Sequence, residues 1–250
     1  MEAAPERIVR AFPALCALQP VRWAAAGLVC APRAAPELAA AALAACPLPV
    51  RALATVPGWP DPPADWVAGW YRRGPGHVPA PVGVRELVQA PGEGFGPMAG
   101  HATTAMCLEA IDAAPAGRAV DAGCGSGLLA QAWARLGRGR VLAVDLDPRA
   151  TEQAGRSLRL AGLAGRVEVR RGPIEALRRG DVARAVLLAN VPAAAHRALA
   201  ARIGDPPAAA VVSGVRPAEE AAVLAGYAGR GLRLQARVQR AGFVCLRLEA

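Results

Sequence analysis

The stretch VDAGCGSG at residues 120–127 decides how the second half of the chain folds. It ends an apolar run of the kind that forms a buried strand, and its glycines permit a tight turn. The helical pattern SGLLAQAWARLG follows at residues 126–137. A strand, a glycine-rich turn and a helix in this order predict a ligand site where backbone N–H groups at the start of the helix are exposed.

Apolar runs and helical patterns go on alternating beyond this stretch. We expect strands within 139–147, 165–172, 184–190 and 208–215, and helices within 148–163, 173–180, 191–204 and 217–231. Continuous apolar strands between helices are typical of a parallel sheet covered on both faces. Residues 232–240 and 243–250 instead alternate apolar and polar side chains, which predicts a closing antiparallel hairpin. The sequence therefore predicts a doubly wound α/β domain with a mostly parallel seven-stranded sheet over residues 85–250.

The first third of the chain has a different character. Residues 1–60 predict a small α+β domain, with strands within 21–32 and 49–57 and a helix at 35–46. Residues 61–84 are rich in Pro, Gly and Trp, and we interpret them as a linker without a regular helix or central strand. Trp66 and Trp70, four residues apart, are expected to cover one helical turn and to pack between domains.

Composition narrows the function classes. Lys and Arg total 29 against 20 Asp and Glu, a formal net charge of +9, and every basic residue is arginine. This balance favours acidic partners, but no arginine run marks a site, so nucleic acid binding is left open. The six cysteines form no CxxC pair, which indicates buried thiols and no metal site. The N-terminus lacks a signal pattern and no apolar stretch is long enough for a membrane span, so we expect a cytoplasmic protein.

Three predicted strand ends carry candidate ligand-binding residues. Ligands of open parallel sheets bind beyond the carboxyl ends of the strands. One end has Gly123, Gly125 and Gly127; a second has Asp145, 22 residues after Gly123, where an acidic residue can meet ribose hydroxyls; the third has Asn190. Each feature also has a purely structural explanation. The glycine turn could serve only tight packing between strand and helix. Asp145 could cap the next helix, and the Asn190 amide could bond to a loop of the protein. Asp147, just before Pro148, is better placed for the cap. Together they favour a nucleoside-type ligand.

The pattern of the turn separates two classes of cofactor. A dinucleotide site needs G-x-G-x-x-G, and the sixth position here is Leu128. VDAGCGSG and VLAVDLDP resemble instead the first two motifs of class I S-adenosylmethionine-dependent methyltransferases. With GFGPMAGHATT at 94–104, LLAN at 187–190 and VVSG at 211–214, the chain resembles the ribosomal protein L-eleven methyltransferase (PrmA-type) family from about Asp65 to its end.

This resemblance implies a class I, Rossmann-like fold, the cofactor S-adenosyl-L-methionine and N-methylation of a lysine or N-terminal amine on a ribosomal protein. It implies catalytic roles for Asn190 and His101 and makes the loop at 94–104 a lid over the cofactor. The cofactor-contacting positions that it implies, including the turn around the first motif, are Thr104, Asp121, Gly123, Gly125, Gly127, Asp145 and Asn190.

Departures from the family pattern leave the substrate open. The loop reads Pro97-Met98-Ala99-Gly100 where the family has Thr-Gly-Thr, and Asn190 is followed by Val191-Pro192 in place of Ile-Leu. The region at residues 1–60 is shorter than the family's substrate-recruiting domain. A methyltransferase acting on RNA or a small molecule, and a non-catalytic binding module of the same fold, are the alternatives.

Overall fold

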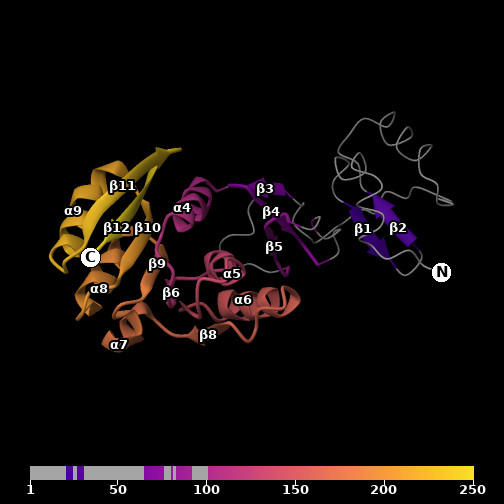
Figure 1. The fold of residues 1–250 in the computed structure, drawn as a ribbon, viewed down its shortest axis with the longest axis horizontal. Helices are drawn as coiled ribbons and strands as arrows, with labels where there is room; N and C mark the ends of the chain where they lie inside the picture. The colour runs from indigo at the N-terminus through magenta and orange to yellow at the C-terminus, as the bar shows by residue number, and fades with distance from the viewer. Residues whose placement is uncertain (1–20, 25–26, 31–64, 76–79, 81–82, 92–100) are drawn as a thin grey trace. The chain divides into compact units, whose positions relative to one another are not determined.

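The computed structural model describes residues 21–24, 27–30, 65–75, 80, 83–91 and 101–250, which Figure 1 colours along the chain. The chain separates into two compact units, Met1–Pro91 and Gly92–Ala250. The expected helix at 35–46 and the expected strand at 49–57 lie outside the described residues. Where one strand was expected within 21–32, two are present, β1 (Val21–Ala24) and β2 (Gly27–Cys30), paired antiparallel.

The interpretation of residues 61–84 as a linker without a central strand was wrong. β3 (Asp65–Val67), β4 (Trp70–Arg73) and β5 (Glu86–Val88) form a three-stranded sheet with β4 in its centre. Ala68 and Gly69 have φ angles of 50° and 78°, which suit a tight hairpin turn. The prolines fall on either side of the β3–β4 hairpin, so they break neither strand.

The expected helical turn with both tryptophans on it is absent for the same reason. Trp66 lies on β3 with 63% of its surface exposed, whereas Trp70 lies on β4 and is buried. The rings of Trp66 and Tyr71, which face each other across the hairpin, have centroids 5.5 Å apart. Arg73 ties β4 to β5 through an ion pair with Glu86 at 2.7 Å.

The second unit contains the predicted seven-stranded sheet. Its strands are β6 (Ala119–Ala122), β7 (Val141–Asp145), β8 (Val167–Arg171), β9 (Val186–Asn190), β10 (Ala209–Val215), β11 (Arg233–Arg240) and β12 (Phe243–Glu249). They lie in the order β11-β12-β10-β9-β6-β7-β8, and β12 alone runs opposite to the other six strands. The prediction of a mostly parallel sheet closed by an antiparallel hairpin is confirmed.

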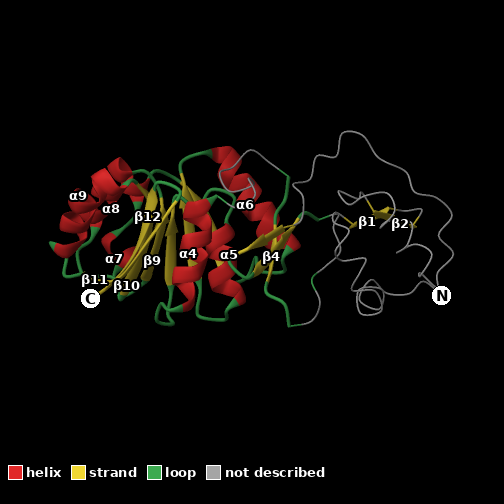
Figure 2. Ribbon diagram, turned by 90° about the horizontal axis from the view of Figure 1, so that it is seen from above, coloured by secondary structure: helices red, strands yellow, loops and turns green. Residues whose placement is uncertain are grey.

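Helices cover both faces of this sheet (Figure 2). They are α4 (Ala102–Asp112), α5 (Leu128–Arg135), α6 (Pro148–Leu160), α7 (Arg179–Val182), α8 (Ala193–Arg202) and α9 (Pro217–Ala228), with a 3-10 turn η1 (Ile174–Ala176) after β8. The apolar side chains of the central strands are buried against both helix layers, as the continuous apolar runs predicted. Cys107, Cys124 and Cys245 are buried free thiols. Among the described residues, no helix is both long and apolar enough to cross a bilayer.

Candidate functional site

The glycine-rich turn after β6 is built for close approach. Gly123, Gly125 and Gly127 have φ angles of 74°, 53° and 84°, a region that L-residues with a side chain rarely enter. The N–H groups of Gly123 and Cys124 both donate to the Val144 carbonyl, at 2.8 and 3.0 Å, so the turn is fixed to the end of β7. Gly127 is the N-cap of α5 and packs against α6, where a Cβ atom on Gly127 would lie 3.1 Å from the Cβ of Ala154.

Asp145, at the end of β7, faces this turn. Its Oδ2 accepts a hydrogen bond from the Gly125 N–H at 2.8 Å, and its Oδ1 accepts one from the Asp147 N–H at 2.9 Å. Asp147 caps α6 by accepting from the Arg149 N–H at 2.9 Å, with Pro148 in the first helical position, as predicted. The carboxylate of Asp145 is thus oriented by two backbone N–H groups, and each oxygen keeps a lone pair for a further donor.

Asn190 ends β9, and the residue after it, Val191, packs closely against two glycines. A Cβ on Gly123 would lie 2.3 Å from Val191 Cγ1, and one on Gly214 would lie 2.4 Å from the Val191 carbonyl oxygen. The Val191 N–H donates to the Ser213 carbonyl of β10 at 3.1 Å. The side chain of Asn190 extends to α4, where its Nδ2 donates to Thr104 Oγ1 at 3.4 Å.

A buried histidine supports the same carbonyl. His196 Nε2 lies 2.9 Å from the Ser213 oxygen and His196 Nδ1 lies 2.9 Å from the Tyr227 hydroxyl. A carbonyl can only accept, so Nε2 carries the proton and Nδ1 accepts from Tyr227. Burial lowers the pKa of His196, which keeps the ring neutral at physiological pH.

These strand ends surround a cavity of about 560 Å³, within the range of small-molecule sites. Five residues predicted from the sequence line it: His101, Gly123, Gly125, Asp145 and Asn190. The remaining lining residues are Thr103, Leu146, Pro173, Ile174, Glu175, Val191, Pro192, Ala195, Gly214 and Phe243. The cavity therefore joins the ends of β6, β7, β9 and β10 with the start of α4 and the turn between β11 and β12.

Three predicted cofactor contacts do not line this cavity. Asp121 is buried beneath the turn, and its Oδ2 accepts from the Ala130 N–H of α5 at 2.9 Å. Gly127 lies where α5 packs on α6, against Ala154. Thr104 does not line the cavity but accepts a hydrogen bond from the side chain of Asn190, which does. The structure thus gives all three a supporting position, and direct cofactor contact by them stays a prediction. Residues 94–100 of the expected lid lie outside the described residues.

Burial alters the titration of the acid beneath the turn. Desolvation raises the pKa of Asp121 to about 7, and the nearby Asp145 carboxylate adds to this rise. Its Oδ1 has no hydrogen-bond partner among the described residues. Burial also raises the pKa of the neighbouring Cys124 thiol, which keeps that thiol neutral. Asp121 does not line the cavity, so the described carboxyl groups on its wall are those of Asp145 and the exposed Glu175.

His101 stands at the start of α4. Its Nδ1 lies 2.7 Å from Thr103 Oγ1, and its ring centroid lies 5.6 Å from that of Phe243. The histidine thus connects the α4 wall of the cavity with the β11–β12 turn. Within the described residues, no group of three or more His, Cys, Asp or Glu side chains could hold a metal ion.

Several lining residues escaped the sequence reasoning. Leu146 is 67% exposed and follows Asp145 directly, so an apolar residue between two aspartates was a usable signal. Ile174 and Glu175 follow the end of β8, a strand end that the same topological rule points to. Phe243 comes from the hairpin turn, and no local pattern reveals that this turn reaches the ends of the central strands.

The amino-acid sequence of the unit that holds this cavity matches a known protein family. The family model described as ribosomal protein L11 methyltransferase (PrmA) matches residues 86–250. The chain belongs to this family. The resemblance predicted from GFGPMAGHATT, VDAGCGSG, LLAN and VVSG is confirmed.

Individual members of the PrmA family show how much of the chain is shared. A ribosomal protein L11 methyltransferase from Gloeobacter violaceus is 33% identical over 199 residues, which is 73% of this chain and 62% of that protein. One from Pelotomaculum thermopropionicum is 34% identical over 205 residues, 79% of this chain and 61% of that protein. The crystal structure of a ribosomal protein L11 methylase from Lactobacillus delbrueckii subsp. bulgaricus superposes with a TM-score of 0.62 at 20% identity, covering 72% of this chain and 94% of that one. The chain thus spans less than two thirds of the length of the curated PrmA relatives that it matches.

Proposed function

We propose that the chain transfers a methyl group from S-adenosyl-L-methionine to an amine nitrogen, most consistently a lysine or N-terminal amine of a ribosomal protein. Membership of the PrmA family supports the reaction class. The observation that carries the proposal is the cavity in which Gly123, Asp145 and Asn190 come together from three parallel strands.

The residues present fit this cofactor. Two backbone N–H groups hold Asp145 with lone pairs toward the cavity, an arrangement suited to the two hydroxyls of a ribose. The turn at Gly123 and Gly125 offers a close backbone approach for the methionine end. Leu146 and Ile174 give apolar surface for the adenine ring. The carboxylates of Asp145 and Glu175 favour a cationic ligand in this cavity.

The cofactor, when bound, supplies a methyl group that is already activated as a leaving sulfonium substituent. The protein's task is then to align the amine and to exclude water. Asn190 Nδ2 donates to Thr104, and its Oδ1 accepts no hydrogen bond among the described residues. We assign this oxygen the role of accepting an N–H of the incoming amine. His101, at the mouth of the cavity, is proposed to orient the nucleophile or the loop before it.

The proton balance of the amine requires no dedicated base. A free lysine amine has a pKa near 10.4, so it arrives protonated at neutral pH. Entry into a desolvated cavity beside a cationic cofactor lowers that pKa and releases the proton to solvent. Residues 1–60 are proposed to take part in recruiting the protein substrate, and residues 85–250 to bind the cofactor and carry out the transfer.

A labelling experiment tests the proposal. Cell lysate is incubated with the protein and S-adenosylmethionine carrying a tritiated methyl group, and label is counted in protein, RNA and small molecules. Label in protein, lost with Asn190→Ala, is the expected result. Label in RNA or in a small molecule alone would replace the substrate class. Cofactor binding by calorimetry without transfer to any fraction would identify a non-catalytic module.

A further inference from the structure

A row of arginines runs along the edge of the large sheet that lies opposite the cavity. Arg118 directly precedes β6, Arg140 directly precedes β7 and Arg166 directly precedes β8, each in the sequence Gly-Arg. Arg184 stands two residues before β9. All four arginines are exposed. Since β9, β6, β7 and β8 are consecutive neighbours in the sheet, the four residues begin four adjacent parallel strands.

The backbone fixes the register of this row. The Val186 N–H donates to the Arg118 carbonyl, the Ala119 N–H to the Arg140 carbonyl and the Val141 N–H to the Arg166 carbonyl, at 2.8 to 3.0 Å. Arg118, Arg140 and Arg166 therefore occupy equivalent positions on neighbouring strands, which lie about 4.8 Å apart. Like charges directly opposite each other in a sheet are destabilising. Such a row is costly for the protein alone and favourable when a polyanion lies along it.

Part of the row also has a structural role. Arg118 donates to the carbonyls of Gly180 and Ala183 at the short helix α7, and Arg166 donates to the Ala134 carbonyl of α5 at 3.3 Å. Cations are favoured at such helix carboxyl ends. This role does not extend to Arg140 and Arg184, which have neither a hydrogen-bond nor an ionic partner among the described side chains.

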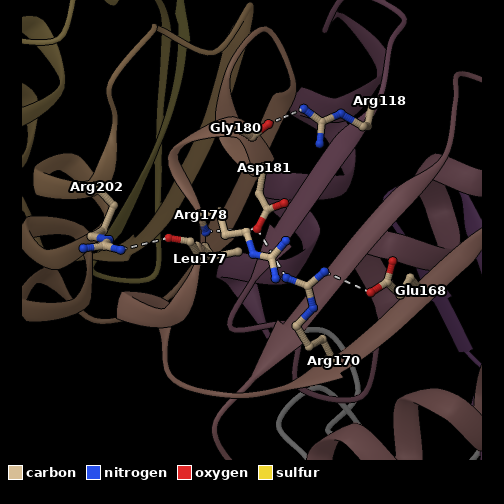
Figure 3. A network of polar contacts seen from close by, with 8 residues as sticks. All are labelled: Arg118, Glu168, Arg170, Leu177, Arg178, Gly180, Asp181 and Arg202. Carbon is tan, nitrogen blue, oxygen red and sulfur yellow. Dashed lines mark hydrogen bonds and ion pairs between the residues drawn. The ribbon is translucent and has the colours of Figure 1, made fainter.

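No carboxylate neutralises the row within the described part of the chain. None of the four arginines forms a salt bridge there. Figure 3 shows that Asp181, which directly follows Gly180 of α7, is paired with Arg170, whereas Arg118 contacts the Gly180 carbonyl. Asp181 accepts from Arg170 at 3.2 Å and from the Arg178 N–H at 3.0 Å. Its charge is already compensated, so the positive potential of the strand-start arginines remains.

We propose that this row, Arg184-Arg118-Arg140-Arg166, is a docking surface for the phosphate backbone of RNA. A guanidinium presents donors in a fork that matches two phosphate oxygens, so arginines at the starts of adjacent strands suit successive phosphates of a chain. The surface is separate from the cavity, because the strands run from the arginines at one edge to Gly123, Asp145 and Asn190 at the other. It would hold RNA without reading bases and is independent of the methyl-transfer reaction.

Salt-dependent binding of the full chain tests this surface. The probes are a fluorescent 20-nucleotide single-stranded RNA, an RNA duplex and a DNA duplex, titrated between 50 and 300 mM salt. Each phosphate contact contributes about 0.7 to the slope of log K against log salt for a single strand. The double variant Arg140→Gln, Arg184→Gln should therefore make this slope shallower by about 1.4 and weaken binding roughly 25-fold at 0.1 M salt.

A charge-matched control separates the row from the general basicity of the chain. Arg197→Gln with Arg216→Gln removes two exposed arginines from α8 and from the start of α9, away from the strand starts. This pair should leave the affinity within twofold. An equal loss in both double variants, or no RNA binding at all, would overturn the proposal. Displacement of RNA by polyglutamate at equal charge concentration would overturn it too, in favour of an acidic protein partner. Binding of the DNA duplex more tightly than of either RNA would overturn the assignment to RNA.

Discussion

Gly214 packs against the peptide of Val191 so closely that a Cβ atom on Gly214 would lie 2.4 Å from the Val191 carbonyl oxygen. The φ of Gly214 is 84°, so a side chain there costs about 1–2 kcal/mol even without the contact. We predict that Gly214→Ala shifts the Val191 peptide and Asn190 with it, lowering the rate of methyl transfer at least tenfold. Single-turnover transfer measurements on the folded variant would show this loss.

Gly162→Ala is the matched control for this variant. Gly162 has a φ of 70°, but nothing lies within 4 Å of its Cβ position, and it is remote from the cavity wall. Because its side chain also stands at positive φ, Gly162→Ala should be less stable in urea denaturation by about 1–2 kcal/mol, and it should keep its transfer rate. Equal rates for the two variants would show that the Gly214–Val191 contact does not position Asn190.

Asp145 and Asp147 give a second matched pair. Asp145→Asn replaces one oriented carboxylate oxygen by an amide nitrogen that cannot accept from a ribose hydroxyl. We predict cofactor affinity 10- to 100-fold weaker, measured by calorimetry with S-adenosylhomocysteine. Asp147→Asn changes only the cap of α6 and should keep the affinity, with a stability loss of at most about 1 kcal/mol. An Asp145→Asn protein that binds as tightly as the unchanged chain would remove the ribose role.

His196 holds the Ser213 carbonyl that also receives the Val191 N–H. His196→Asn shortens the side chain, so the Ser213 carbonyl keeps only the Val191 N–H and the buried Tyr227 hydroxyl loses its acceptor, which costs about 1–3 kcal/mol. We predict a lower kcat with little change in cofactor affinity, because Asn190 and not the cofactor cradle is released. His196→Gln, whose amide N–H can stand near the position of Nε2, should recover part of both losses. A Gln variant no better than the Asn variant would speak against the Ser213 bond as the cause.

Asp121 makes stability depend on pH. Its pKa is about 7 in the folded chain and near 3.8 in the unfolded chain, so the folded state binds more protons between these values. Stability from this group is therefore full at acidic pH and is lost as the pH rises toward 7, by an amount on the order of 4 kcal/mol. Asp121→Asn, which can still accept from the Ala130 N–H, should lack this decline. Urea denaturation of both proteins at pH 5 and pH 8 gives the comparison, and parallel declines in the two would refute the assignment.

Much of the second unit could be predicted because its strands are continuous apolar runs bounded by glycine. The β11–β12 hairpin could also be predicted from the sequence, because apolar and polar residues alternate on both sides of Ala241-Gly242. The three-stranded sheet of the first unit could not be predicted from composition, because residues 61–84 taken together are dominated by Pro and Gly. The strands occupy the few positions between the prolines, and only their pairing around Ala68-Gly69 reveals them.

The site residues, too, divide into those that local sequence predicts and those that depend on long-range packing. Gly123, Asp145 and Asn190 could be placed together because parallel strands end at one edge of a sheet. Phe243 could not, because its position depends on how β12 packs beside β10, a long-range pairing. The supporting position of Asp121 was also hidden. Its neighbour Gly123 reaches the cavity, whereas Asp121 points beneath α5, and that distinction depends on the exact turn.

A crystal structure with S-adenosylhomocysteine tests the central claim most directly. We predict that the ribose hydroxyls contact Asp145, that the amino-acid end lies at Gly123 and Gly125, and that the sulfur faces Asn190 across the cavity. A ligand bound elsewhere, or a cavity that stays closed by its own side chains at saturating ligand, would contradict the account.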